Sequence, residues 1–285
     1  MARAGERTVR EALLDTRRRL REAGIATADL DAEVLLGHVL RLTRETLHAH
    51  PERHLAASQS ARLEQLVERR SRREPVAYLT QVKEFYGLPI RVDPRVLIPR
   101  PETELLVERA LQYLRTHPER NDVIDVGTGT GAIALAIASG AASARVIAIE
   151  ADTAALQVAR GNVRRLGKRR VRLRQGDLLA HVRAADLVVA NLPYLSDRRR
   201  KQLSPDVQFE PKRALDGGAD GLRLIRRLIE QAKGVIRAEG MLLLECDPEQ
   251  VRRIRGMVLG SWPDSIVSVH DDLAGHPRVV EVAIR

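Results

Sequence analysis

The chain has 285 residues, of which 44% are hydrophobic and 2% are aromatic, so we expect one large domain or two smaller ones with an aliphatic core. No apolar run reaches the roughly 18 residues that a membrane span requires, and the N-terminus resembles no secretory signal. The single cysteine, Cys246, excludes an internal disulfide framework. These features predict a cytoplasmic protein that does not interact with membranes.

The formal net charge of +10 and the pI of about 10.5 favour acidic partners such as nucleic acid. A proteome rich in arginine would give the same excess on any soluble enzyme. The arginines are also not interleaved with aromatic residues, so stacking on bases is not indicated. The charge is therefore compatible with a nucleic-acid partner but does not favour it over other partners.

Apolar residues recur at helical spacing from residue 8 to about residue 73. Within this region, "TADLDAEVLLGHVL" predicts a helix that is capped by Asp29 and carries Leu30, Val34 and Leu35 on its buried face. Short amphipathic helices must pack on one another to bury their apolar faces. We therefore expect residues 1–77 to form a small helical bundle domain.

The pattern changes where prolines punctuate short extended pieces. "KEFYGLPIRVD" predicts a β-hairpin that turns at Gly87, so residues 78–98 are interpreted as a hairpin linker. "RPETELLVERALQYL" then predicts a helix with acidic residues in its first turn, where the helix dipole favours them.

From residue 122 onward, strand-like and helix-like segments alternate. "DVIDVG", "RVIAIE", "VRLRQGD", "DLVVANLP", "GMLLLE" and "SIVSVHDD" have the pattern of strands. "GAIALAIASG", "DTAALQVARGNVRRLG" and "GLRLIRRLIEQAKGVIR" have the pattern of helices. Such alternation predicts an α/β fold with a doubly wound, mainly parallel sheet over residues 99–285.

A glycine-rich turn joins the first predicted strand of this region to the first helix. Gly127, Gly129 and Gly131 allow the backbone to bend tightly and to approach a ligand. The pattern also fits the dinucleotide fingerprint of nicotinamide enzymes. However, Asp125 lies in the strand just before the glycines, where a carboxylate suits a cationic ligand better than a pyrophosphate. Glu150 ends the next strand, where a ribose-binding carboxylate is expected.

S-adenosylmethionine combines a ribose, an ammonium group and a sulfonium without a phosphate, so it fits this pattern best. Asp177 ends the third predicted strand and could accept a hydrogen bond from the adenine amino group. The expected product is S-adenosylhomocysteine. The predicted cofactor-binding residues are Asp125, Gly127, Thr128, Gly129, Thr130, Gly131, Glu150, Asp177, Leu178 and Asn191.

The predicted strand in "DLVVANLPYL" stops abruptly at an amide, a leucine, a proline and a phenol. Pro193 cannot donate a backbone hydrogen bond, so the sheet ladder must break there. Asn191 and Tyr194 are then presented at the carboxyl end of a strand, which is the edge where open α/β sheets bind ligands.

Several longer stretches resemble one family in the family's order: "DAEVLLGHVL", "REPVAYLTQVKEFYGLPIRVDPRVLIPRPETELLVE", "VIDVGTGTGAIALAIA", "FEPKRALDGGADGLRLIRRLI" and "DLAGHPRVVEV". They are similar to the protein-(glutamine-N5) methyltransferases that modify bacterial peptide chain release factors. The resemblance covers nearly the whole chain. It implies a Rossmann-like methyltransferase sheet, preceded by the helical domain and the hairpin.

The resemblance also implies the catalytic residues Asn191, Leu192, Pro193 and Tyr194, with no metal ion. In the family, the asparagine side chain and the next backbone carbonyl accept from the substrate NH₂ group, and the tyrosine ring packs on the planar target. Leu192 replaces the proline that is usual in the family, but leucine offers the same backbone carbonyl. The implied substrate is the glutamine of the Gly-Gly-Gln loop in class 1 release factors. We further expect the helical domain to dock this substrate, because a short loop offers few contacts for recognition.

Two other functions stay open at this point. Asn-Leu-Pro-Tyr is also typical of ribosomal RNA adenine dimethyltransferases, so an adenine N6-methyltransferase acting on nucleic acid is the main alternative. The RNA enzymes place their small helical domain after the catalytic domain, whereas here it comes first. A non-enzymatic RNA-binding protein is the third hypothesis, but it would not need a complete cofactor site.

Overall fold

The computed structural model describes residues 7–285 and divides into two compact units. The first unit contains the described residues up to Gln81 together with the short segment Ser204–Phe209. The second contains Val82–Leu203 and Glu210–Arg285. The hairpin that the sequence analysis interpreted as a linker is thus grouped with the second unit.

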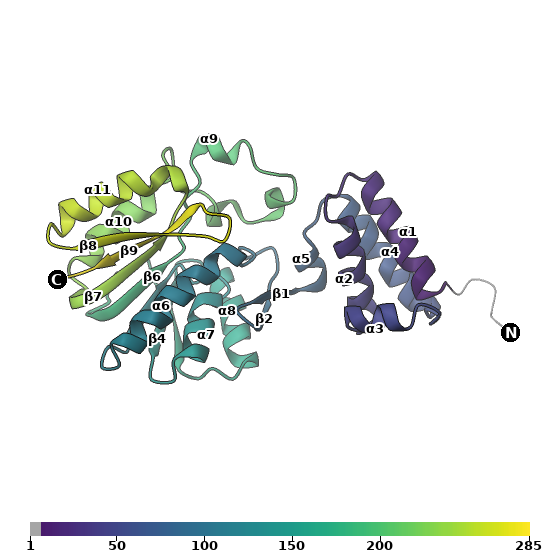
Figure 1. Cartoon of the computed structure of the whole chain (residues 1–285), viewed down its shortest axis with the longest axis horizontal. Helices are drawn as coiled ribbons and strands as arrows, with labels where there is room; N and C mark the ends of the chain where they lie inside the picture. Colours follow the sequence, from purple (N-terminus) through teal and green to yellow (C-terminus); the bar gives the residue numbers. More distant parts are fainter. Residues whose placement is uncertain (1–6) are drawn as a thin grey trace. The chain divides into compact units, whose positions relative to one another are not determined.

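The first unit is a bundle of helices, as its apolar spacing indicates (Figure 1). The helices are α1 (Val9–Glu22), α2 (Ala28–Leu40), α3 (Arg44–Ala49), α4 (Ala57–Ser71) and α5 (Val76–Thr80). Helix α1 begins with a capping box, in which the Thr8 side chain accepts from the Glu11 amide and the Glu11 side chain accepts from the Thr8 amide. Leucine, isoleucine, valine and alanine side chains fill the core, so this bundle is aliphatic throughout.

The predicted details of helix α2 are wrong in two respects. The helix begins at Ala28, so Asp29 lies inside its first turn, where it pairs with Arg21 across 2.7 Å instead of capping the helix. Leu30 is 46% exposed, whereas Leu35 is fully buried. The buried face is shifted because Asp31 turns inward to pair with the equally buried Arg70. The spacing of apolar residues along the sequence cannot reveal such a buried ion pair.

The second unit opens with the predicted hairpin, formed by β1 (Val82–Phe85) and β2 (Leu88–Arg91). Tyr86 and Gly87 both have positive φ, which suits the two-residue turn between them. Asn162 fixes this hairpin to the rest of the unit. Its side chain accepts from the Arg91 amide at 2.8 Å and donates to the carbonyls of Arg91 and Thr130 at 2.9 and 3.0 Å.

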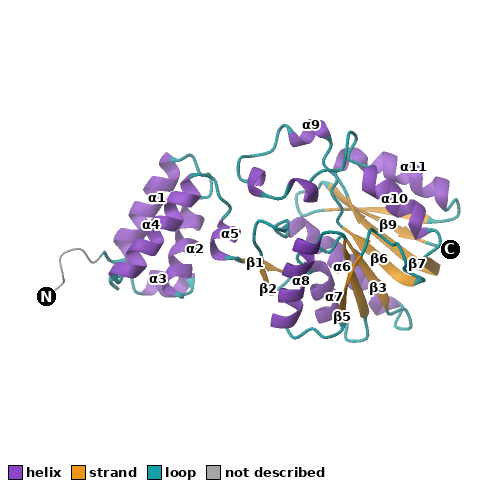
Figure 2. Ribbon diagram, turned by 180° about the vertical axis from the view of Figure 1, so that it is seen from behind, coloured by secondary structure: helices purple, strands orange, loops and turns teal. Residues whose placement is uncertain are grey.

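The sheet has seven strands in the order β5-β4-β3-β6-β7-β9-β8 (Figure 2). The first five are parallel and confirm the predicted doubly wound sheet: β5 (Val171–Gln175), β4 (Arg145–Glu150), β3 (Asp122–Val126), β6 (Ala185–Ala190) and β7 (Ile236–Glu245). Strand β9 (Pro277–Ala283), which the sequence analysis did not predict, lies antiparallel between β7 and β8 (Ile266–Asp271).

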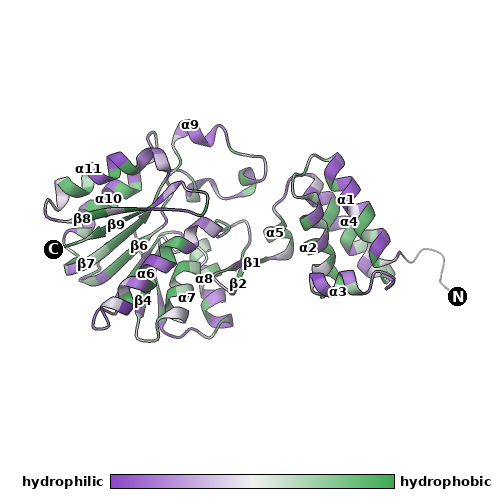
Figure 3. Cartoon of the chain, in the orientation of Figure 1, coloured by the Kyte–Doolittle hydropathy of each residue, from purple (hydrophilic) through white to green (hydrophobic). Residues whose placement is uncertain are grey.

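Helices cover both faces of the sheet (Figure 1). One face carries α6 (Glu104–Thr116), α7 (Ala132–Gly140) and α8 (Thr153–Arg165), and the other carries α10 (Arg223–Ala232) and α11 (Val251–Ser261). The short helix α9 (Asp197–Arg200) lies in the long connection after β6. The hydrophobic colour of the strands in Figure 3 marks the core between these layers.

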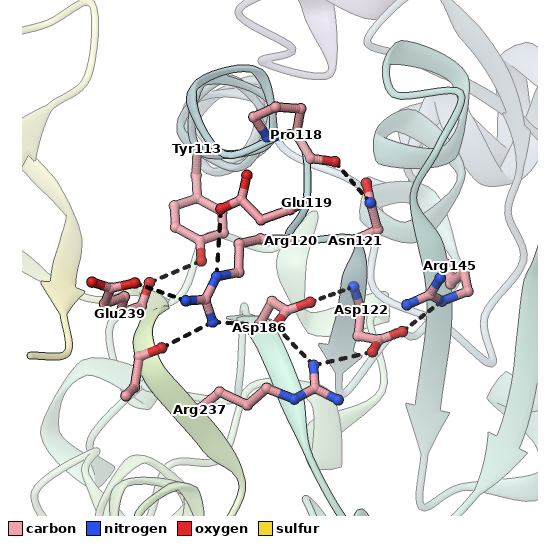
Figure 4. A network of polar contacts seen from close by, with 11 residues as sticks. Tyr113, Pro118, Glu119, Arg120, Asn121, Asp122, Arg145, Asp186, Arg237 and Glu239 are labelled. Atoms are coloured by element: carbon pink, nitrogen blue, oxygen red, sulfur yellow. Dashed lines mark hydrogen bonds and ion pairs between the residues drawn. The ribbon is translucent and has the colours of Figure 1, made fainter.

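The amino ends of the strands are held together by an ion-pair network (Figure 4). Asp186, which is buried at the start of β6, accepts from the Asp122 amide at 3.0 Å and from the Arg237 guanidinium at 2.8 Å. Arg237 also reaches the Asp122 carboxylate at 3.0 Å, and Arg145 reaches the same carboxylate at 2.7 Å. The network thus ties together β3, β4, β6 and β7 at the edge opposite to their carboxyl ends.

Candidate active site

A cavity of about 240 Å³ opens at the carboxyl ends of β3, β4 and β6. This is the edge where strands of an open α/β sheet present loops to ligands. Most of the predicted site residues line it, although they come from four separate stretches of the chain. These lining residues are Gly127, Thr128, Gly129, Thr130, Glu150, Asp177, Leu178, Asn191, Leu192 and Pro193. Asp125, Gly131 and Tyr194 are not among the lining residues.

The glycine turn has the backbone that its sequence predicts. Gly127, Gly129 and Gly131 have φ values of 73°, 54° and 82°, a region that side chains rarely allow. A Cβ atom on Gly127 would lie 2.8 Å from a methyl group of Leu192. The turn is therefore packed directly against the residue that follows Asn191, so the two halves of the predicted site share one wall.

The Asp125 side chain holds the glycine turn in place through hydrogen bonds. Its carboxylate is fully buried and accepts from the Thr128 hydroxyl at 2.5 Å and from the Ala134 amide at 3.1 Å. Burial raises the pKa of Asp125 to about 7 despite these two donors. Asp125 thus fixes the turn to the start of helix α7 in the described structure.

Glu150 presents its carboxylate at the cavity wall. Oε2 accepts from the Gly129 amide at 2.9 Å and Oε1 accepts from the Asp152 amide at 3.0 Å. Burial raises the pKa of Glu150 above its usual value. Each oxygen retains capacity for a further hydrogen bond, so the carboxylate can accept from two neighbouring hydroxyl groups.

Strand β6 ends at Ala190, and the next four residues form the predicted catalytic corner. Asn191 lies at the cavity wall and its Nδ2 donates to Oγ1 of Thr103 at 3.0 Å. Leu192, which stands where the family usually has proline, is 4% exposed and belongs to the hydrophobic core of the sheet. The Tyr194 hydroxyl donates to Oε1 of Glu245 at 3.3 Å, and burial raises the pKa of Tyr194.

The carboxylate of Asp177 faces another partner in this structure. It forms an ion pair with Arg227 across 2.5 Å and its side chain is 57% exposed. Leu178, in contrast, is buried and contributes an apolar surface to the cavity wall. An adenine ring in this part of the cavity would therefore contact Leu178 directly, whereas Asp177 would have to share its carboxylate with Arg227.

Several lining residues were missed by the sequence analysis, and some of them belong to ion pairs. Arg100 is paired with the buried Glu210, which also accepts from the Ile98 amide at 3.1 Å. Arg213 is paired with Asp152, whose carboxylate caps helix α8. These pairs tie the segment after α9 to the cavity rim. The stretches "LIPRPETE" and "FEPKRAL" carried the signal as family blocks, but no residue in them was assigned.

Residues 7–285 hold no cluster of three or more histidine, cysteine, aspartate or glutamate side chains that is suited to a metal ion. None of their helices has the length and the apolar character that crossing a membrane requires.

The sequence was compared with known proteins. Residues 11–80 match the family model of the PrmC N-terminal domain, and residues 102–209 match that of the methyltransferase small domain. Release factor glutamine methyltransferase of Moorella thermoacetica is 42% identical over 275 residues, which cover 95% of this chain and 96% of that protein. The chain belongs to the release factor glutamine methyltransferase family. The family resemblance inferred from the sequence motifs is thereby confirmed.

More distant members of the family agree with this assignment. The enzyme of Escherichia coli K12 is 38% identical over 237 residues, covering 82% of this chain and 85% of that protein. Solved structures outside the family share the fold at low identity. They include the hMettl16 catalytic domain, with a TM-score of 0.56, 14% identity and coverage of 82% of this chain and 85% of that one. A Thermus thermophilus 16S rRNA methyltransferase has a TM-score of 0.52, 17% identity and coverage of 72% and 50%.

Proposed function

We propose that this enzyme transfers a methyl group from S-adenosylmethionine to the side-chain amide nitrogen of the glutamine in the Gly-Gly-Gln loop of class 1 release factors. The observation that carries the proposal is the shared cavity. Asn191 and Leu192 line the same space as the glycine turn and Glu150, so a cofactor and a planar amide can meet there. The names of the family members support the release factor as the substrate.

The cavity residues fit S-adenosylmethionine by their chemistry. Glu150 offers two acceptor oxygens for the two ribose hydroxyls, and the three positive-φ glycines leave room beside it. Leu178 offers an apolar surface for the adenine. A related fold supports this choice, since the rRNA methyltransferase of Thermus thermophilus was solved in complex with AdoMet and guanosine. When bound, this cofactor supplies an electrophilic methyl group on a sulfonium.

The task of the protein is to align an unreactive nitrogen. The lone pair of an amide nitrogen is delocalised into the carbonyl, so the nitrogen is a poor nucleophile. Oδ1 of Asn191 and the Leu192 carbonyl can accept from the two N–H groups of the substrate amide. The amide is then held so that the nitrogen lone pair points towards the methyl group. As the bond from nitrogen to the methyl carbon forms, the carbon–sulfur bond breaks, sulfur keeps the electron pair, and nitrogen loses one proton to solvent. Alignment of this kind contributes a large part of a catalysed displacement.

Methylation assays with purified substrates test the proposal. The enzyme is incubated with labelled S-adenosylmethionine and a purified release factor, and peptide mass spectrometry locates the added methyl group. We expect one methyl group on the loop glutamine and none on a release factor in which that glutamine is replaced by alanine. Label in neither protein, or equal label in both, would contradict the proposal.

The adenine N6-methyltransferase remains the alternative because of one basic stretch. Between Thr153 and Gly176 there are eight cations and no acidic residue, on helix α8, on edge strand β5 and in the turn between them. None of these eight side chains lines the cavity, which argues against their guiding a base into it. The same labelling assay with ribosomal RNA distinguishes the two functions. The eight cations are Arg160, Arg164, Arg165, Lys168, Arg169, Arg170, Arg172 and Arg174.

A further inference from the structure

The orientation of the Asn191 amide decides whether the proposed chemistry can work. An asparagine side chain has one acceptor oxygen and one donor NH₂ group, and the two ends have nearly the same shape. The substrate glutamine also presents an NH₂ group. If Asn191 were reversed, two donors would face each other and the substrate nitrogen would lose one of its two acceptors. Something outside Asn191 must therefore select the orientation.

Thr103 is the residue that contacts the other end of this amide. It is 4% exposed, and its Oγ1 accepts from Nδ2 of Asn191 at 3.0 Å. This contact leaves Oδ1 of Asn191 as the amide atom available in the cavity. Thr103 occupies the N-cap position of helix α6, but its hydroxyl makes no capping hydrogen bond. The side chain is therefore not needed to begin the helix.

A threonine hydroxyl can also donate, so it would select the orientation only if its proton is engaged elsewhere. Glu245, which is 2% exposed at the end of β7, meets this requirement. Its Oε1 accepts from the Tyr194 hydroxyl at 3.3 Å. Burial raises the pKa of Glu245 to about 7, although the nearby Thr103 hydroxyl acts to lower it. Oε2 of Glu245 is buried and has no hydrogen-bond partner among the described residues, so it is available to accept the Thr103 proton. Above about pH 7 this carboxylate is ionised and can only accept, so it would draw the Thr103 proton to Oε2 and leave Oγ1 as an acceptor for Asn191.

We propose that Thr103 and Glu245 are positioning residues that hold the Asn191 amide with Oδ1 towards the substrate nitrogen. The proposal rests on the proposed function, because the direction matters only if the substrate presents an NH₂ group. The order of donation is Asn191 to Thr103 and Thr103 to Glu245, so the buried carboxylate sets the direction of both hydrogen bonds. Neither positioning residue contacts the reacting atoms.

The side-chain amide signals of Asn191 test the proposal in the free enzyme, without any substrate. In ¹⁵N-labelled protein these signals are assigned by their loss in Asn191→Ala. We expect one of the two Nδ2 protons to exchange slowly with water in the wild type and in Thr103→Ser. In Thr103→Val, which has the same shape without the hydroxyl, this protection should disappear. Unchanged protection in Thr103→Val would overturn the proposal.

Kinetics test the consequence for the reaction. We expect Thr103→Val to lower kcat about 100-fold, as misalignment of reacting groups does, while its cofactor affinity and its KM for the release factor stay near wild type. Thr103→Ser keeps the hydroxyl and should restore kcat. A Thr103→Val enzyme with the wild-type kcat would overturn the positioning role while leaving the proposed function intact. A wild type that methylates no release factor would refute the proposed function, and the amide signals would still test the orientation.

Discussion

Asn191 and Glu150 lie on the same cavity wall, but their contacts suggest different tasks. Asn191 is held through Nδ2 by Thr103, so its free oxygen can face a substrate. Glu150 is held by the backbone amides of Gly129 and Asp152, so its carboxylate is fixed beside the glycine turn. Separate variants of the two residues should therefore separate methyl transfer from cofactor binding.

Asn191→Ala removes one of the two proposed acceptors for the substrate nitrogen. We expect kcat to fall by about 100-fold or more, by analogy with the loss of one hydrogen bond that stabilises a transition state. Cofactor affinity should stay close to wild type because Glu150 and the glycine turn are unchanged. Single-turnover assays and calorimetry measure the two quantities. Turnover near the wild-type rate would remove Asn191 from the mechanism.

Glu150→Ala should have the opposite profile. Hydrogen bonds to a charged group contribute about 1.5–3 kcal/mol each, so loss of the ribose contacts should weaken cofactor binding about 10- to 100-fold or more. Glu150→Gln retains the size and one acceptor oxygen, and it should bind with intermediate affinity. Titration calorimetry checks both variants. An unchanged Kd in Glu150→Ala would show that the ribose is not bound there.

Asp125 makes the stability of the ligand-free protein depend on pH. Burial raises its pKa from 3.8 to about 7 in the folded state, so between these values the folded chain holds a proton that the unfolded chain has released. The contribution of Asp125 to stability is therefore greatest below about pH 4, falls as the pH rises to about 7 and is constant above. Asp125→Asn cannot titrate. The free energy of unfolding of the wild type, measured relative to this variant in denaturant titrations, should fall between about pH 4 and about pH 7. A constant difference would contradict the raised pKa.

At the scale of elements, the carboxyl ends and the amino ends of the parallel strands are built differently. The carboxyl edge holds the cavity, whereas the amino edge is closed by the network around Asp186 in Figure 4. Strand β6 connects the two, since Asp186 lies near its start and Asn191 follows its last residue. A change at Asp186 should accordingly affect the stability of the sheet without altering the chemistry at its other end.

Asp186→Ala tests this separation. It leaves the Asp122 amide without its acceptor, whereas Arg237 keeps Asp122 as a partner, so we expect a loss of about 1–3 kcal/mol in the free energy of unfolding. Activity per folded molecule should be unchanged at temperatures well below unfolding. Glu239→Gln is the matched control, because its side chain is 77% exposed and surface ion pairs contribute about 0–1 kcal/mol. Equal losses in the two variants would contradict the importance of burial at Asp186.

At the scale of the whole molecule, the helical unit needs a function of its own. It has a separate aliphatic core, and none of the predicted catalytic or cofactor residues lies within it. The proposed target is a short glycine-containing loop, which offers few contacts for selecting one protein among many. We therefore predict that the helical unit binds the release factor away from the loop and raises the local concentration of the loop at Asn191.

A truncated chain that begins at Val82 tests this prediction. We expect it to keep its cofactor affinity and to lose most activity on the intact release factor. Its weak activity on a short Gly-Gly-Gln peptide should change much less. Both substrates are assayed with full-length and truncated enzyme, after circular dichroism has confirmed that the truncated chain is folded. Equal proportional losses on peptide and protein would leave the helical unit as structural support only.

Patterns local in the sequence were sufficient to predict most of the catalytic unit. Parallel strands bring their carboxyl ends to one edge, so the glycine turn, Glu150 and Asn191 could be placed together without knowledge of the packing. The same reasoning identified the doubly wound sheet from the alternation of strands and helices. It did not identify β9, whose position between β7 and β8 depends on a pairing that the strand pattern does not specify.

Tertiary structure alone decided which groups hold the site residues in place. Thr103 is 88 residues from Asn191, and Glu245 is 51 residues from Tyr194. No periodicity relates such distant partners, because a hydrogen bond between side chains depends on how separate elements pack. Apolar spacing reports which faces are buried, but a buried polar group is stable only beside a specific partner. The sequence by itself therefore determined the sheet and the place of its ligand edge, whereas packing determined the direction of each hydrogen bond there.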